Sequence, residues 1–340
     1  MAKLAEQRDR KRKHGGVRPG GPGFSGRTDG WRFDVRDYIV YIGFLTILAF
    51  FAFALRDTGF LTVANFMTII RQTAPITVMA VGMVFVLSAG EIDLSIGAVV
   101  ALSALSAALV LQSTGSVWLA VLASLGVGLA VGLFNGLVTV VARIPSFLVT
   151  LGTLSIVEGV ARVITSLDSV PVINPTFTNL FGSGQLGPVS VLLVWSAAIV
   201  IVGHLLYRNT RFGRRVLSTG GNLQAAISVG IKTGRVKIAV LTMSALCAAL
   251  AGALYAGRLH GARYTLGEAD LLTVIAAVVI GGTSLFGGKG SVVGALTGSI
   301  IMGMLGNGLV IMGLSVAEQM IARGVIIIVA VVLSLREMRT

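Results

Sequence analysis

Cysteine, histidine and charge are scarce in this chain of 340 residues. It has one cysteine, Cys247, and three histidines, and 12% of its residues are charged, against the roughly 25% usual in a soluble domain. A single cysteine excludes a disulfide within the chain, and no two histidines have the spacing of metal ligands. No nucleophile-elbow motif occurs either. The sequence therefore predicts a protein that is not an enzyme and carries no metal site.

Apolar residues, by contrast, make up 55% of the chain. They come in runs of about 18 to 25 residues, near the ~20 residues that a helix needs to cross a ~30 Å hydrocarbon core. The runs do not alternate in polarity as the strands of a membrane barrel do. We expect an all-α, polytopic bundle of about eight to ten transmembrane helices. The expected spans are residues 38–55, 72–89, 94–113, 117–141, 147–164, 189–207, 237–257, 271–286, 291–312 and 318–335.

Two short breaks leave the number of spans open. Residues 90–93 and 287–290 interrupt the apolar pattern, and a broken or re-entrant helix at either one would change the path of the chain. The second break lies within GGTSLFGGKGS at 281–291, which at first suggests a nucleotide-binding loop. It lacks the glycine five residues before Gly288, and the serine or threonine after Lys289, that a Walker motif needs. We therefore expect a turn or helix break there.

Basic residues outnumber acidic ones by 27 to 14, but their positions argue against a nucleic-acid partner. Ten of the basic residues lie before residue 37, so we expect residues 1–37 to be a disordered cytoplasmic tail that touches anionic lipid. Seven more lie in the loop at 208–237, which has no acidic residue. Because Lys and Arg mark cytoplasmic loops, this loop and the C-terminal residues 336–340 are also predicted inside.

Five expected spans precede the polar stretch at 166–188, and five follow it. A repeat with an odd number of spans inverts its orientation, so two such halves would form an inverted five-helix repeat. The tetrapeptide NGLV occurs at 135–138 and again at 307–310, and an inverted repeat would account for this recurrence. Chance recurrence in so narrow a composition explains it equally well, and the sequence leaves the question open.

The stretch GEIDLSIG at 90–97 places two carboxylates, Glu91 and Asp93, between long apolar runs. In one interpretation Asp93 caps the following span by accepting from the free amides of its first turn, while Glu91 lies at the membrane interface. In the other, the carboxylates mark a polar pathway, because a carboxylate at membrane depth costs at least ~2.5 kcal/mol unless it faces a cavity. These residues alone do not decide between the two.

Ordered segments of the chain resemble a known family. GMVFVLSAGEIDLSIGAVVALSA at 82–104 resembles the signature segment of the ribose-type sugar permeases, the membrane subunits of carbohydrate ABC importers. Stretches similar to the same family follow in the same order at 142–161, 220–237 and 275–315. The resemblance covers roughly residues 38–335, which are therefore expected to form the transmembrane permease domain.

This resemblance implies a permease subunit of an ATP-binding-cassette importer in a bacterial inner membrane, with both termini cytoplasmic. Such a subunit forms a homodimer or pairs with a related permease. It binds a cytoplasmic ABC ATPase and receives a monosaccharide or related polyol from a periplasmic binding protein. ATP and magnesium would bind to the ATPase, so no cofactor is expected on this chain. The alternative is an ion-coupled secondary sugar transporter that uses Glu91 and Asp93 as its coupling carboxylates.

Candidate site residues fall into two sets. The loop GGNLQAAISVGI resembles the short helix that docks into the ATPase, and the alternative for it is a solvated basic loop without a partner. The residues expected to couple to the ATPase are Gly220, Gly221, Asn222, Ala225, Ala226, Ile227 and Gly230. The residues expected along the substrate path are Glu91, Asp93, Ser95, Asn135, Thr283, Ser284 and Asn307.

The chain departs from the family pattern at two places. The family motif usually reads Gly-Gly-Ile-Asp-Leu-Ser, and Glu91 replaces its second glycine. Many members also carry Glu-Leu-Asp just before the Ile-Ala-Ala-Val-Val run, where this chain has Leu-Leu-Thr at 271–273. Glu268 and Asp270 lie slightly upstream, and the sequence leaves open whether they fill the missing role. The resemblance therefore gives no identity for the sugar.

Overall fold

The computed structural model describes residues 39–337, so the tail at 1–37 lies outside the described residues and its expected disorder and lipid contact stay predictions. The described helices are α2 (Ile39–Ala54), α3 (Val63–Ser88), α4 (Ile96–Thr114), α5 (Val117–Val141), α6 (Ser146–Thr165), α7 (Pro175–Phe181), α8 (Val191–Asn209), α9 (Arg211–Gly221), α10 (Leu223–Ser228), α11 (Thr233–Leu259), α12 (Asp270–Ile280), α13 (Val292–Ile311) and α14 (Val316–Glu337). The strands are β1 (Val170–Pro171), β2 (Gln185–Leu186), β3 (Val189–Ser190) and β4 (Gly261–Ala262).

The helices confirm the prediction of an all-α, polytopic membrane bundle. Each of the ten expected spans contains a helix. Among the described residues, 7 helices are long and apolar enough to cross a membrane, namely α3, α4, α5, α6, α8, α11 and α13. α2 and α12 are shorter apolar helices.

The largest differences from the expected spans are at the start of α3 and the end of α12, and local sequence explains both. α3 begins at Val63, well before residue 72, because the Thr62 side chain accepts from the amide of Asn65 and caps the helix. α12 was expected to continue to residue 286 but ends at Ile280, where two glycines follow. Its 11 residues, at about 1.5 Å each, cover only about half of a ~30 Å hydrocarbon core. α12 is therefore a half-helix, followed by an irregular segment.

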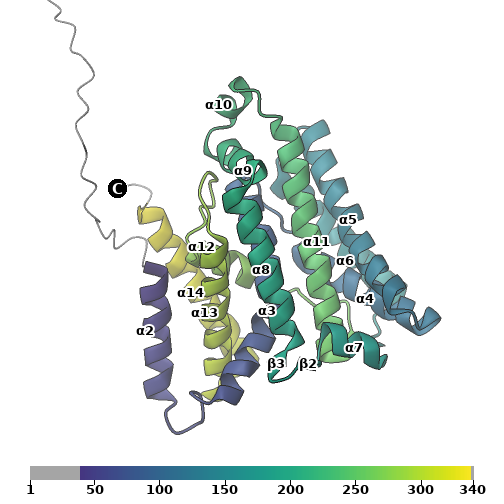
Figure 1. The fold of residues 1–340 in the computed structure, drawn as a ribbon, viewed down its shortest axis with the longest axis vertical. Coiled ribbons are helices and arrows are strands. Elements are labelled where there is room, and N and C mark those ends of the chain that lie inside the picture. The colour runs from purple at the N-terminus through teal and green to yellow at the C-terminus, as the bar shows by residue number, and fades with distance from the viewer. Residues whose placement is uncertain (1–38, 338–340) are drawn as a thin grey trace, which may run out of the picture. The chain divides into compact units, whose positions relative to one another are not determined.

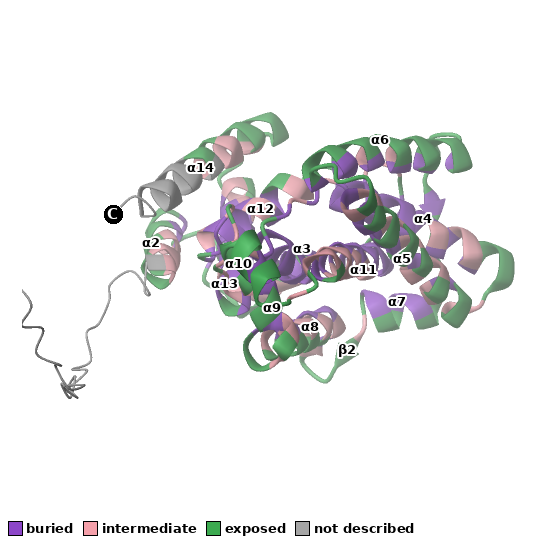
Figure 2. Ribbon diagram, turned by 90° about the horizontal axis from the view of Figure 1, so that it is seen from above, coloured by how far each residue is buried: buried purple, intermediate pink, exposed green. Residues whose placement is uncertain are grey.

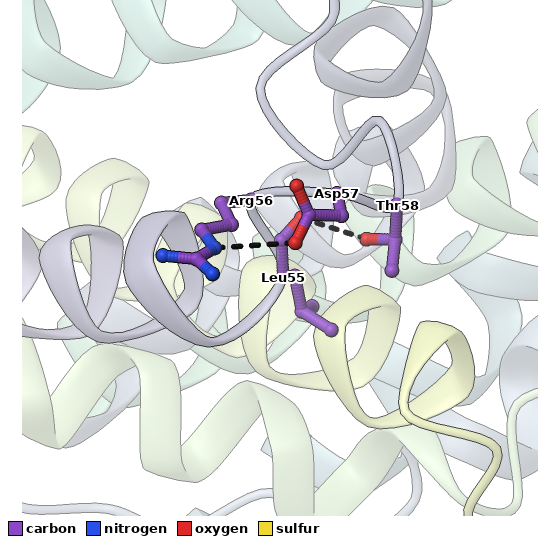
Figure 3. Close-up of polar contacts among 4 residues, drawn as sticks. All are labelled: Leu55, Arg56, Asp57 and Thr58. Carbon is purple, nitrogen blue, oxygen red and sulfur yellow. Dashed lines mark hydrogen bonds and ion pairs between the residues drawn. The ribbon is translucent and has the colours of Figure 1, made fainter.

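A short turn joins α2 to α3 (Figure 3). In it the Thr58 hydroxyl donates to the Leu55 carbonyl (2.8 Å), and Arg56 Nε donates to Asp57 Oδ2 (3.1 Å). Both charged side chains are exposed, so the pair contributes at most about 1 kcal/mol. Its charges suit the polar surface where two membrane helices are joined.

The core lies where α11 packs against α3, α4 and α5 (Figure 1). Glycine makes this packing close: a Cβ on Gly132 would lie 2.6 Å from Thr242 Cα, and one on Gly136 would lie 2.8 Å from Ile238 Cα. Small residues of this kind let helix backbones meet in lipid, where apolar burial gives no drive for association. Figure 2 shows the buried residues gathered in α3, α4 and α11, while α5 and α6 carry exposed outer faces. Those faces are rich in leucine and valine, which suits contact with lipid.

The two ends of the bundle carry different structures. α9 and α10 lie at one end, drawn uppermost in Figure 1, and α7, β2 and β3 lie at the opposite end. β1 pairs antiparallel with β4, with Val170 opposite Ala262, and this ties the stretch after α6 to the loop after α11. We refer below to the α10 end and the opposite end.

Candidate functional site

The stretch GEIDLSIG forms a break between α3 and α4. α3 ends at Ser88, and Gly90 turns the chain with a φ of 76°, a conformation that suits glycine. Glu91 is 5% exposed and forms an ion pair with Lys237 near the start of α11, with 2.5 Å between Oε1 and Nζ. The charge at this position is therefore compensated by a lysine of the basic loop, and Glu91 does not lie free at an interface.

Asp93 lies at the centre of a buried polar cluster and is 0% exposed. Its Oδ1 accepts from the amide (3.0 Å) and the hydroxyl (2.7 Å) of Ser95, and Ser95 Oγ accepts from Asn135 Nδ2 of α5 (3.0 Å). The N-cap position of α4 belongs to Ser95, so Asp93 closes the turn just before the helix instead of capping its first turn. Three predicted path residues, Asp93, Ser95 and Asn135, thus meet at this break, while Glu91 of the same break pairs with Lys237.

Several oxygen atoms of this cluster are buried without a hydrogen-bond partner among the described residues. They include Asn135 Oδ1 and Thr139 Oγ1 of α5. Ser244 of α11 lies beside the Asp93 carboxyl, and Thr139 follows Asn135 by one helical turn. A buried polar atom without a partner costs about 1–3 kcal/mol. Groups of this kind in a membrane protein suit a path whose contents supply the missing partners.

A second break follows the half-helix α12. Gly287 and Gly288 both have positive φ, and Thr283 Oγ1 accepts from the amide of Ser291 (3.3 Å) at the start of α13. The amide of Gly288 donates to the carbonyl of Ser88 (3.0 Å), which joins this break to the end of α3. Thr283 and Ser284 therefore lie in the second break, next to the first break but outside the Asp93 cluster.

Gly220, at the end of α9, lies between the two breaks. A Cβ on this residue would overlap the Ser88 carbonyl oxygen and would lie 2.8 Å from the amide nitrogen of Gly288. Only glycine lets the α9 backbone approach both segments at once. The loop that carries α10 thus touches the bundle at the two points where its helices are interrupted.

The residues of α10 divide between an inner and an outer face. Asn222 Oδ1 accepts from the amide of Ala225 (3.0 Å) and so caps the helix. Ala226, one of the residues expected to couple to the ATPase, is 2% exposed and therefore does not lie on the outer face. Leu223, Ile227 and Val229 are the exposed apolar side chains there.

Asn307 lies apart from the other predicted path residues. It is on α13 toward the opposite end, where its Oδ1 accepts from Asn65 Nδ2 of α3 (3.0 Å). Asn65 also donates to the Phe60 carbonyl (2.9 Å), so Asn307 helps to hold the start of α3. The predicted path residues therefore occupy three places instead of one.

A charged cavity nearer the opposite end was not predicted from the sequence. It has a volume of about 210 Å³ and lies among α3, α11, α12, α13 and α14. Tyr255 Oη donates to Asp270 Oδ2 (2.7 Å), and the Arg258 guanidinium stacks 5.3 Å from the Tyr255 ring centroid. Its polar lining residues include Gln72, Thr73, Tyr255, Arg258, Asp270, Thr273 and Arg323. We name this the outer cavity.

A sequence signal for the outer cavity exists and was missed. Gly-Glu-Ala-Asp at 267–270 repeats the pattern of Gly-Glu-Ile-Asp at 90–93, and its glycine, Gly267, also has a positive φ. The first segment lies between the second and third expected spans of the first half, and the second lies at the same point of the second half. This is the correspondence that an inverted repeat requires. It relates Asp93 in the buried cluster to Asp270 in the outer cavity.

Comparison with known proteins covers nearly all of the described bundle. Residues 65–331 match the family described as branched-chain amino acid transport system / permease component. The chain is 37% identical over 282 residues to the ribose import permease protein RbsC of Bacillus subtilis, covering 82% of this chain and 87% of that protein. It is 35% identical over 303 residues to the L-arabinose ABC transporter permease protein AraH of Azospirillum brasilense, covering 88% of each. The chain belongs to the ribose-type family of ABC importer permeases.

Membership of this permease family favours an ATP-driven importer over an ion-coupled secondary transporter. A further relative, RbsC of Escherichia coli strain K12, is 36% identical over 310 residues, covering 89% of this chain and 94% of that protein. No solved structure matches the permease. Its function is therefore argued from its own geometry and from these relatives.

The structure also locates the second departure of the permease from its family pattern. Thr273 stands where many members have the aspartate, and Asp270 precedes it by three residues on the same helix. Both line the outer cavity, so the carboxylate has moved by about one turn along one face of α12. Glu268 instead lies 3.7 Å from Arg162 of α6. Of the two upstream acids, Asp270 is the one that enters the cavity.

Proposed function

We propose that this permease carries a monosaccharide or a related polyol into the cell across the bacterial inner membrane, driven by a separate ATPase. Relatives named as ribose, L-arabinose and xylose permeases support this substrate class. A periplasmic binding protein would deliver the sugar, and a second copy of the permease or a related chain would complete the pore. ATP and magnesium would bind to the ATPase, and this chain would carry no cofactor.

Charge supports a cytoplasmic location for the α10 end. Seven basic residues and no acidic one lie between residues 208 and 237, and this excess is typical of cytoplasmic loops. With that orientation both termini would be cytoplasmic. The outer cavity would then face the periplasmic half, and the Asp93 cluster the cytoplasmic half. A sugar moving inward would pass Asp270 in the outer cavity first and Asp93 in the buried cluster second.

The observation that carries the proposal is the position of Gly220. An ATPase that binds α10 through Leu223, Ile227 and Val229 would move the end of α9, which touches Ser88 and Gly288 directly. Helices packed this closely shift together because there is no side chain to absorb the displacement. ATP-driven movement of α10 would thus reach both breaks, and the breaks border the buried path residues.

The experiment that tests this function uses the assembled complex. The permease would be co-expressed with its ATPase, purified in lipid nanodiscs and supplied with the binding protein. We expect the two chains to purify together and ATP hydrolysis to rise when the sugar-loaded binding protein is added. Failure of the permease to associate with any ATPase, or hydrolysis that no loaded binding protein stimulates, would contradict the proposal.

A further inference from the structure

The outer cavity carries more positive than negative charge. Arg258 and Arg323 line it together with one carboxylate, Asp270. Among the described residues, however, neither arginine forms an ion pair with Asp270. Glu268 does not neutralise the excess, because it lies beside Arg162 on α6. The cavity therefore holds one unbalanced positive charge.

The hydrogen-bonding capacity left in the cavity suits a ligand with several hydroxyl groups and an acid. Asp270 Oδ2 is used by Tyr255, which leaves Oδ1 to accept from a ligand hydroxyl. Arg258 uses Nη1 to donate to the Arg71 carbonyl (3.0 Å) and keeps its other donors, while Arg323 has no hydrogen bond among the described residues. A guanidinium group can donate two parallel hydrogen bonds to the two oxygens of a carboxylate. A single hydroxyl group offers one oxygen and cannot accept both.

Thr273 lies about one turn from Asp270 on the cavity face of α12. A threonine hydroxyl adds a hydrogen-bonding group there without adding charge.

We infer that the outer cavity binds a sugar acid, a monosaccharide-sized polyhydroxylated carboxylate, in preference to the matching neutral sugar. Arg323 and Arg258 hold the ligand carboxylate, and Asp270, Gln72 and Thr273 bond its hydroxyl groups. This inference rests on the proposed function, since it names the class of sugar that the same transport path accepts.

The test compares ligands that differ only in the acid group. Binding of D-galacturonate and D-galactose, and of D-glucuronate and D-glucose, would be measured by calorimetry on the full-length permease in nanodiscs without binding protein. We expect at least one acid to bind about tenfold or more tightly than its neutral partner, the difference typical of a charge-assisted pair. Equal binding, tighter binding of the neutral sugars, or no binding of either class would overturn the inference.

Variants of Arg323 test whether the preference for the acid arises in the outer cavity. Arg323→Gln is expected to remove the preference for the acid, and Arg323→Lys, which keeps the charge, to retain part of it. Arg143→Gln, a change of the same type in the exposed turn after α5, is the matched control and should leave the preference unchanged. A preference that survives Arg323→Gln in a folded protein would place the acid elsewhere and overturn the inference.

Uptake measurements distinguish the failure of this inference from the failure of the proposed function on which it rests. If the assembled importer takes up neutral sugars and rejects the acids, the function stands and the inference fails. If it takes up no sugar of either class with any loaded binding protein, the function itself fails.

Discussion

Gly220 at the end of α9 lies so close to the carbonyl of Ser88 at the end of α3 that a single added carbon would overlap it. This approach joins the loop that carries α10 to the first helix break, and the hydrogen bond from Gly288 to the same carbonyl (3.0 Å) joins the second break. One backbone oxygen thus connects three segments that are far apart in sequence.

Replacing Gly220 by alanine should uncouple the ATPase from the permease. The new methyl group would force α9 away from Ser88 and Gly288, so we expect ATP hydrolysis to continue while sugar uptake falls at least tenfold, as displaced catalytic or coupling geometry commonly causes. Gly221→Ala is the matched control, because its Cβ would lie 3.6 Å from Gly288 Cα, at ordinary contact distance. Normal uptake by Gly220→Ala would show that this contact does not transmit movement.

Asp93 should be needed for transport and not only for the turn before α4. Asp93→Asn keeps an oxygen that accepts from Ser95 but removes the charge, so we expect a stable protein with little uptake. Asp93→Ala should in addition lower the free energy of unfolding by about 1 to 3 kcal/mol, because the buried amide and hydroxyl of Ser95 would lose their acceptor. The measurements are uptake by the assembled importer and stability in detergent. Wild-type uptake by Asp93→Asn would leave Asp93 with a purely structural role.

The ion pair between Glu91 and Lys237 should stabilise the first break against α11. A double-mutant cycle with Glu91→Gln and Lys237→Gln measures this coupling directly, and we expect about 1 to 2 kcal/mol, because Glu91 is buried while Lys237 is partly exposed. Arg235→Gln, which removes a cation from the same segment, serves as the control. Additive effects of the two single changes would mean that the pair contributes nothing to stability.

The outer face of α10 should determine binding to the ATPase. Ile227→Glu places a charge in the middle of the exposed apolar side chains and should reduce co-purification with the ATPase while the bundle stays folded. Gln224→Glu adds the same charge at an exposed polar position of the same helix and should have a much smaller effect. Ala226→Glu is expected to damage folding, because Ala226 faces the bundle. Equal co-purification of the Ile227 and Gln224 variants with the ATPase would rule out this face as the docking surface.

Hydropathy alone predicted most of the helices, because apolar runs of spanning length have few alternatives in a membrane. It failed at α12, where the run continues through Leu285 and Phe286 but the helix ends at Ile280, just before Gly281. Glycine permits the break after α12. Its position is explained by the contacts that the broken segment makes with α13, Gly220 and Ser88. The close approach of Gly220 depends on three distant segments and could not be found by local pattern.

The candidate site was predicted only in part. Asp93, Ser95 and Asn135 do meet, because a polar group buried in the bundle is satisfied best by other polar groups, whereas Glu91 pairs with Lys237. Asn307 was also predicted on the path but lies elsewhere, bonded to Asn65. The more informative repeat was Gly-Glu-X-Asp, which relates Asp93 to Asp270, but its two copies share too few residues to stand out in one sequence.

The most direct test of the central claim is sugar uptake into proteoliposomes. The permease would be reconstituted alone or with its ATPase, with the binding protein outside and ATP or an ion gradient as the only source of energy. We predict uptake when permease, ATPase, binding protein and ATP are all present, and none when any one is omitted. Uptake by the permease alone, driven by a proton or sodium gradient without ATP, would contradict the account.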